Sequence, residues 1–331
     1  MTVNQILDYS PREVEISTQH PIYSVLFAHD GKQVLSGDGE GMLRRWQVEQ
    51  GSEVGEPIKV ENAEIYAAEL SPDNKWLVCG LHAPDSGSEM ARVGVWDAQT
   101  HQKVLDIKGH TSSVWSVNIS SDSTKFATGG LDNQAFIWSI ATGERLVGPL
   151  RHDGLVVAVG FSPSGDHIAT ATAENPDPKS IRIYDSENGQ LLLDIPFQAS
   201  KNTSASLAWS ADGRQLFAVS YGEVKHFDIS SGSLLNKWSV PGGTWAASLI
   251  LSRNEKFMVI VASNSLSFWD TSTQQQIGTA IEHASLVWSI ALSPDDECIA
   301  TGEDDGKVTL RGLRNILPDS YLTAQVSSSI Y

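Results

Sequence analysis

The chain has 331 residues and carries 40 acidic against 23 basic side chains, so its formal net charge is −17 at pH 7. This balance argues against binding to a nucleic-acid backbone, which depends on clustered Lys and Arg side chains, and Arg44-Arg45 is the only adjacent basic pair in the sequence. The two cysteines, Cys79 and Cys298, are far apart in the chain and indicate buried core residues rather than a disulfide framework.

We expect neither a membrane span nor a signal peptide. No apolar run approaches the roughly 20 residues that a transmembrane helix needs. The first residues lack a basic segment followed by an apolar one. The expected location is the cytoplasm, with the nucleus as an alternative, and we expect no membrane and no nucleic acid among the partners.

Short apolar runs separated by turn residues fill the sequence and predict an all-β protein. A strand is expected first at residues 13–17. Seven inner strands follow, in which apolar residues recur at every second position: Tyr23-Val25-Phe27, Tyr66-Ala68-Leu70, Trp115-Val117-Ile119, Val157-Val159-Phe161, Ala205-Leu207-Trp209, Ala247-Leu249-Leu251 and Trp288-Ile290-Leu292. Most of these runs end in a turn like Ser71-Pro72-Asp73.

Each repeat closes on a characteristic position, and successive positions differ by 42 to 50 in residue number: Trp46, Trp96, Trp138, Tyr184, Phe227, Trp269 and Arg311. A period of about 40–45 residues is typical of a propeller built from four-stranded blades. A three-stranded unit buries too little apolar surface to be stable alone, so the units must stack on one another. Seven closing positions predict seven blades.

The best-defined unit resembles the WD repeat. Gly109-His110 opens it, Asp132 stands in its second turn and Trp138 closes it. The resemblance implies a buried hydrogen-bond chain through His110, Thr128, Asp132 and Trp138. Such a group also suggests catalysis, because it contains His, Asp and Thr. A structural role is favoured, since repeat cores reuse this network in blade after blade.

The fold class expected from these observations is all-β: a seven-bladed β-propeller of four-stranded antiparallel blades over residues 1–313, followed by a C-terminal tail at 314–331. The strand at 13–17 has no blade of its own, and the last repeat supplies three strands. We therefore expect this N-terminal strand to join the last blade beside residues 307–313. That arrangement closes the ring and covers an exposed sheet edge.

The repeat pattern is uneven. The fifth and sixth repeats lack both the histidine and the turn aspartate, and two second turns are enlarged, at residues 81–92 and 173–179. Insertions in a repeat array map to loops on one face, often the binding face. The seventh repeat has Arg311 where tryptophan is expected, but keeps three candidate members of the hydrogen-bond chain, His283, Thr301 and Asp305.

Large aromatic residues open four of the predicted inner strands and form the candidate partner-binding site. The full set is Tyr23, Tyr66, Trp115 and Trp288, together with Leu131, Asp304 and Trp245 in neighbouring loops. In WD-repeat propellers this position lies near the rim of the central channel, so the resemblance implies a binding face there. Trp and Tyr dominate binding hot spots. The alternative is that these aromatic residues fill the wedges between adjacent blades as core residues.

Motifs for catalysis or cofactor binding are lacking. The glycine-rich run at 37–41 lies between two strands with no helix to bind phosphate, Glu303-Asp304-Asp305 lacks the spacing of a calcium loop, and the histidines lack zinc spacing. We expect no catalytic residue, metal or cofactor. The resemblance implies a non-catalytic scaffold, a monomer or a subunit of a larger complex, that binds a protein or peptide partner at its channel-entrance face. The alternative is a small-ligand receptor or hydrolase-type enzyme that uses the acidic channel mouth.

Overall fold

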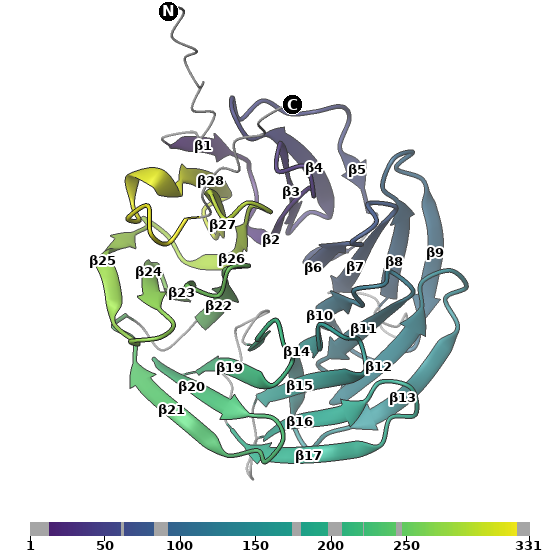
Figure 1. Cartoon of the computed structure of the whole chain (residues 1–331). Helices are drawn as coiled ribbons and strands as arrows, with labels where there is room; N and C mark the ends of the chain where they lie inside the picture. Colours follow the sequence, from purple (N-terminus) through teal and green to yellow (C-terminus); the bar gives the residue numbers. More distant parts are fainter. Residues whose placement is uncertain are drawn as a thin grey trace, which may run out of the picture.

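The described part of the chain is a ring of seven small sheets. The computed structural model describes residues 13–60, 63–82, 92–173, 180–197, 207–220, 222–242 and 247–322. These residues form seven four-stranded antiparallel sheets, arranged as blades around a central axis (Figure 1). The seven-bladed propeller predicted from the repeat period is confirmed. The described residues contain no helix long and apolar enough to cross a membrane.

The blades follow one another in chain order, and the first strand of each lies nearest the axis (Figure 1). Blades 1 to 3 contain β2 (Ile22–Phe27), β3 (Gln33–Asp38), β4 (Met42–Gln47) and β5 (Ile58–Lys59); β6 (Glu64–Leu70), β7 (Trp76–His82), β8 (Arg92–Asp97) and β9 (Lys103–Lys108); and β10 (Val114–Ile119), β11 (Lys125–Gly130), β12 (Gln134–Ser139) and β13 (Arg145–Arg151).

The remaining blades repeat the arrangement, and the last one recruits a strand from the start of the chain. Blades 4 to 7 contain β14 (Leu155–Phe161), β15 (His167–Ala173), β16 (Ser180–Asp185) and β17 (Leu191–Pro196); β18 (Leu207–Trp209), β19 (Gln215–Ser220), β20 (Glu223–Asp228) and β21 (Leu234–Ser239); β22 (Ala247–Leu251), β23 (Phe257–Ala262), β24 (Ser265–Asp270) and β25 (Gln276–Glu282); and β26 (Val287–Leu292), β27 (Cys298–Glu303), β28 (Lys307–Gly312) and β1 (Val14–Ser17).

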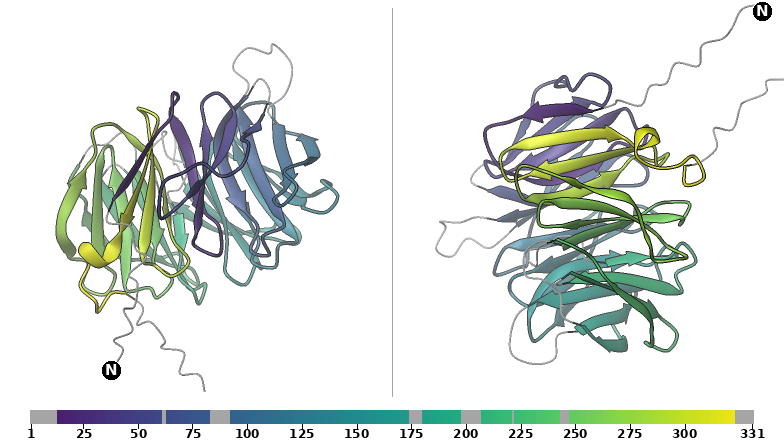
Figure 2. Two further views of the ribbon diagram at one scale, coloured as in Figure 1. Left: turned by 90° about the horizontal axis from the view of Figure 1, so that it is seen from above. Right: turned by 90° about the vertical axis from the view of Figure 1, so that its left-hand side faces the viewer.

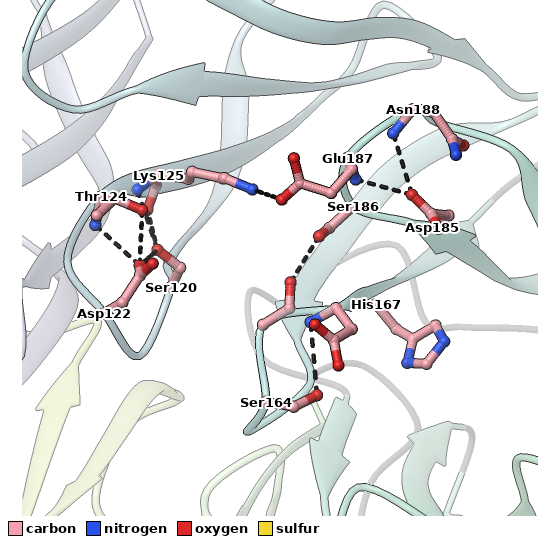
Figure 3. Close-up of polar contacts among 12 residues, drawn as sticks. Ser120, Asp122, Thr124, Lys125, Ser164, His167, Asp185, Ser186, Glu187 and Asn188 are labelled. Atoms are coloured by element: carbon pink, nitrogen blue, oxygen red, sulfur yellow. Dashed lines mark hydrogen bonds and ion pairs between the residues drawn. The ribbon is translucent and has the colours of Figure 1, made fainter.

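Side-chain hydrogen bonds hold the turns between the first two strands of the blades. In blade 3, Asp122 accepts hydrogen bonds from the Ser120 hydroxyl at 2.6 Å and from the Thr124 N–H at 3.0 Å (Figure 3). Short polar side chains bond the backbone of such turns directly, which explains why Ser and Asp recur there. Lys125, the next residue, forms an ion pair with Glu187 of blade 4 and links two neighbouring blades.

Hydrogen bonds between inner strands join neighbouring blades. The Ser24 hydroxyl of β2 accepts the backbone N–H of Ala68 in β6 at 3.0 Å. The corresponding position of β6 is Ala67, which has no hydroxyl, and the Glu69 carboxylate instead accepts the N–H of Ile119 in β10 at 3.0 Å. Burial raises the pKa of Glu69 to about 8, although the hydrogen bonds it accepts act in the opposite direction. Blades are thus fastened by polar contacts as well as by packing.

Strand β1 closes the ring. It pairs antiparallel with β28 as the outermost strand of blade 7, so the expected closure is confirmed (Figure 1). Ile16 is the buried side chain of β1. Arg311 occupies the position where other blades have an aromatic residue, and its Nη2 atom lies 2.7 Å from the Glu13 Oε1 atom. Arg311 therefore forms an ion pair in place of the missing tryptophan, and this ion pair connects β28 to the residue that precedes β1.

The segment after blade 7 packs against the propeller. It begins with the 3-10 turn η1 (Leu313–Asn315), at the edge of the ring in the side view (Figure 2). Leu317 and Leu322 are buried in the same apolar cluster as residues of blades 6 and 7. The Tyr321 hydroxyl donates to Asp270 Oδ2 at 2.7 Å. Residues 314–322 of the expected tail thus lie on blades 6 and 7, and residues 323–331 are outside the described part of the chain.

Candidate functional site

The four residues of the implied hydrogen-bond chain meet inside blade 3. His110 Nε2 lies 2.8 Å from Thr128 Oγ1, and His110 Nδ1 lies 3.0 Å from Asp132 Oδ1. The Trp138 indole donates to Thr128 Oγ1 at 2.9 Å. Burial opposes ionisation of Asp132, but its hydrogen bonds, first that from His110, lower its pKa overall. Because the side chains of His110 and Asp132 are 0% and 3% exposed, the group holds the blade together and offers no reactive atom to a substrate.

Blade 7 builds a similar network with a different acid. His283 Nδ1 lies 2.9 Å from Glu303 Oε1, which also accepts hydrogen bonds from the hydroxyls of Thr301 and Thr309. The expected partner, Asp305, instead lies 3.6 Å from Lys307 Nζ. The expectation of Asp305 in this role was wrong. Glu303, the last residue of β27, has its side chain inside the blade and bonds His283 Nδ1 in its place.

The aromatic residues that open the inner strands lie at β-bulges. In blades 1, 2, 3 and 7 the pairing between the first two strands skips one residue, and the skipped residues are Tyr23, Tyr66, Trp115 and Trp288. A bulge adds a residue to one strand and redirects its side chain. The uniform two-residue alternation assumed from the sequence is therefore interrupted at these positions, because each skipped residue has no partner in the ladder.

The four bulge residues form one continuous group, which we name the aromatic arc. Tyr23 of blade 1 contacts the arc residues of both neighbouring blades. Its ring centroid lies 5.8 Å from that of Trp288 in blade 7 and 4.9 Å from that of Tyr66 in blade 2. Tyr66 continues the contact to Trp115 of blade 3 at 4.9 Å. Each of the four side chains is half-buried. The arc therefore spans four blades and keeps part of its aromatic surface accessible.

Comparison with known proteins agrees with this geometry. A family model described as "WD domain, G-beta repeat" matches residues 13–47, 101–139 and 274–310. These three segments are WD repeats. Each matched segment begins on the outermost strand of one blade and continues through three strands of the next. The sequence repeat of this WD-repeat propeller is thus offset by one strand from its blades, which is why β1 is left to close the ring.

Two relatives extend the similarity beyond these segments. The WD-repeat propeller is 26% identical over 228 residues to the serine-threonine kinase receptor-associated protein of Gallus gallus, a match that covers 69% of this chain and 61% of the relative. It is 26% identical over 298 residues to the protein groucho of Drosophila melanogaster, covering 87% of this chain and 32% of the relative. The chain spans about three fifths and one third of the lengths of these proteins.

Acidic groups flank the aromatic arc. The Trp288 indole donates to Asp304 Oδ1 at 2.9 Å, so these two predicted residues are in contact. Burial, then a hydrogen bond to Glu64, raises the pKa of Tyr66. Burial, with the charges of Glu64 and Asp304, also raises the pKa of Tyr23. Both phenols therefore stay protonated at neutral pH, beside two carboxylates.

The two remaining predicted residues are Leu131 and Trp245. Leu131 lies in the turn between β11 and β12, where its backbone N–H donates to the Ser113 carbonyl at 2.9 Å. Trp245 lies outside the described residues. Sequence reasoning missed His82, whose ring stacks on Tyr66 at a centroid distance of 5.2 Å. It also missed Glu64, although the position of Glu64 two residues before Tyr66 in a strand was a usable signal.

The acidic run at the end of β27 does not converge on one point. Glu303 bonds His283 inside the blade, Asp304 bonds the Trp288 indole, and Asp305 lies beside Lys307. A calcium site needs several oxygen ligands directed at one cation. The described residues contain no group of three or more His, Cys, Asp or Glu side chains placed to hold a metal ion.

Proposed function

We propose that this WD-repeat propeller is a non-catalytic scaffold that binds a protein or peptide partner through the aromatic arc. The arc itself carries the proposal, because four large aromatic side chains from four blades lie together and stay half-exposed. Trp and Tyr supply much of the binding energy of an interface once a partner excludes water from them.

The charge around the arc favours a basic partner segment. Glu64 and Asp304 flank the aromatic rings, and the whole chain has a net charge of −17. Lys and Arg side chains are attracted to carboxylates and also to the faces of Trp and Tyr rings. Long-range attraction further accelerates the encounter with a positively charged partner. A Lys- or Arg-containing segment therefore fits the arc best.

A scaffold role also agrees with the relatives and with the buried hydrogen-bond network. The name of the Gallus gallus relative records association with a kinase receptor, which supports a protein partner for this chain. The His, Thr, Asp and Trp side chains that resemble a catalytic group are enclosed in blade 3. Cys79 and Cys298 are buried free thiols, which favours a reducing location such as the cytoplasm or nucleus.

Peptide display on the wild-type propeller, followed by affinity measurements, tests the proposal. We expect selected peptides to be rich in Lys and Arg, and the double variant Tyr66→Ala/Trp115→Ala to bind them more than 10-fold more weakly, since a hot-spot residue contributes about 2 kcal/mol or more. The matched control is Leu234→Ala/Leu235→Ala, which truncates two side chains on β21 that are 47% and 49% exposed.

The control variant should retain the wild-type affinity, and both variants should keep the wild-type melting temperature. An arc variant that binds the selected peptides as tightly as the wild type would remove this surface from consideration. Selection of acidic peptides would contradict the expected partner chemistry. Recovery of cellular proteins by the wild type and the control, but not by the arc variant, would extend the result to natural partners.

A further inference from the structure

A cavity lies between blades 1 and 2, away from the aromatic arc. Strand β2 has Tyr23 of the arc near its beginning, and Ala28, directly after its end, lines the cavity. The cavity has a volume of about 310 Å³, at the small end of the range for ligand sites. Its apolar wall includes Leu35, Leu43 and Leu77. The cavity is therefore large enough for a small molecule and lies at the opposite end of the inner strands from the arc.

The outer strand of blade 1, which lines the cavity through Ile58, is short. Strand β5 has two residues, whereas the outer strands of blades 2 to 6 have six or seven. In blade 3 the turn before the outer strand packs on such a strand, and a Cβ atom on its Gly143 would lie 3.2 Å from the Ile107 side chain. The equivalent turn of blade 2 lines the cavity through Ala98, Gln99 and His101, together with Ile58 of β5.

That turn of blade 2 has a histidine where four other blades have glycine and blade 6 has Gln274. The His101 N–H donates to the carbonyl four residues earlier, and its φ is 60°. The same bond and a positive φ occur at Gly51, Gly143, Gly189 and Gly232. A side chain at positive φ is strained relative to glycine, and such strain concentrates at functional sites. The histidine is therefore retained at a conformational cost, and its ring lines the cavity.

The cavity also contains an arginine without an acidic partner. Arg44 forms an ion pair with Glu53 at 2.8 Å, but among the described residues no carboxylate lies within ion-pair distance of Arg45. The Arg45 Nη2 atom lies 3.4 Å from His101 Nδ1. Because a guanidinium only donates hydrogen bonds, Nδ1 accepts and the neutral ring carries its proton on Nε2. Burial, then the charge of Arg45, lowers the pKa of His101, in agreement with a neutral ring.

Two hydrogen-bond donors in this region are left unused. The His101 Nε2 and Arg44 Nε atoms are buried and have no hydrogen-bond partner among the described residues. Buried donors are nearly always paired in folded proteins, so these two unpaired donors, beside a guanidinium that has no carboxylate partner, favour an acceptor from outside the chain. A planar carboxylate matches the fork of a guanidinium and accepts from an imidazole N–H at the same time.

We propose that this cavity binds a small organic monocarboxylate, with the carboxylate held by Arg45 and His101 and the apolar body packed on the leucine side chains. Asp30 and Glu56 also line the cavity. Their charges repel any anion and act about twice as strongly on a doubly charged one, so a monocarboxylate is favoured over a phosphate or a dicarboxylate. The proposal is independent of the aromatic arc, because it concerns other residues at the other end of the inner strands.

Calorimetric titration with 3-phenylpropionate, its uncharged amide and inorganic phosphate tests the assignment. We expect saturable binding of 3-phenylpropionate by the full chain, and binding of the amide and of phosphate at least 10-fold weaker. Arg45→Gln should weaken 3-phenylpropionate binding at least 10-fold. Ala98→Phe, which fills the cavity while Arg45 stays in place, should abolish it. Arg182→Gln, which removes an arginine that pairs with Asp153 and Asp194 in blade 4, should leave it unchanged.

Several results would overturn the proposal. These are the absence of saturable 3-phenylpropionate binding by the wild type, equal affinity for the acid and its amide, tighter binding of phosphate, or full binding by Arg45→Gln. If Arg45→Gln lowers the melting temperature, Ala98→Phe decides, and full binding by that variant refutes the site. Loss of 3-phenylpropionate binding in the arc variant Tyr66→Ala/Trp115→Ala would move the ligand to the arc and likewise refute it.

Discussion

Closure of the ring by β1 is open to a direct test through Ile16, the buried side chain of that strand. Ile16 is 6% exposed and belongs to an apolar cluster with Trp46, Val308 and residues of both terminal blades. Truncation of a buried isoleucine to alanine removes transfer free energy and leaves a cavity, so Ile16→Ala should destabilise the protein by about 3 kcal/mol. With roughly 2.1 cal/mol/K of unfolding entropy for each of the 331 residues, this corresponds to a fall in melting temperature of about 4 °C.

Urea denaturation followed by tryptophan fluorescence, together with calorimetry, measures the change. The matched control is Val104→Ala on β9, the outer strand of blade 2, where the side chain is 47% exposed. The control should change stability by less than about 0.5 kcal/mol. Deletion of residues 1–18 should have a much larger effect than Ile16→Ala, because it exposes the whole edge of β28. A deletion variant that melts like the full chain, or equal effects of Ile16→Ala and Val104→Ala, would refute closure by β1.

Two further predictions concern buried polar groups. Thr128→Val should cost about 2–4 kcal/mol in urea denaturation, because it removes the hydroxyl that accepts from the Trp138 indole and donates to His110 Nε2, whereas Thr128→Ser should retain most of the stability and the exposed Thr142→Val should be nearly neutral. Equal effects of the Val and Ser variants would contradict this role. Burial lowers the pKa of His152 to about 4, so between pH 6.5 and 4 the folded state binds fewer protons than the unfolded state and stability falls with falling pH, by about 2 kcal/mol at pH 5. His152→Gln should flatten this slope in melts from pH 7 to 5, and an unchanged slope would exclude His152 as its source.

The features that could be predicted from the sequence are those built within one repeat. Trp138 and Thr128 lie on adjacent strands of one blade, joined by a short turn, and the resemblance to the WD repeat implied that they meet. The repeat period and the expected seven blades followed from the recurring closing positions. The aromatic positions were also recognisable, because they recur at the start of successive inner strands. Residues within one repeat lie on consecutive strands joined by short turns, so their relative positions can be predicted from the sequence.

Features that depend on a choice between competing partners were less predictable. Both Glu303 and Asp305 stand near His283 in the chain, and the position of each side chain on β27 or in the following turn decides which one bonds the histidine. The bulge at Trp115 is similar, because the skipped residue is visible only when the pairing of β10 with β11 is known. A two-residue pattern cannot show where a ladder slips by one residue.

The sequence by itself determined the strand content, the repeat length and the strand left over to close the ring, because each follows from periodicity. The members of the blade 3 hydrogen-bond chain were implied by the resemblance to the WD repeat. Tertiary structure alone decided which residues from different blades meet. The contact of Tyr23 with Trp288, and that of Arg45 with His101, join residues far apart in the chain. These contacts depend on how the closed ring places neighbouring blades side by side.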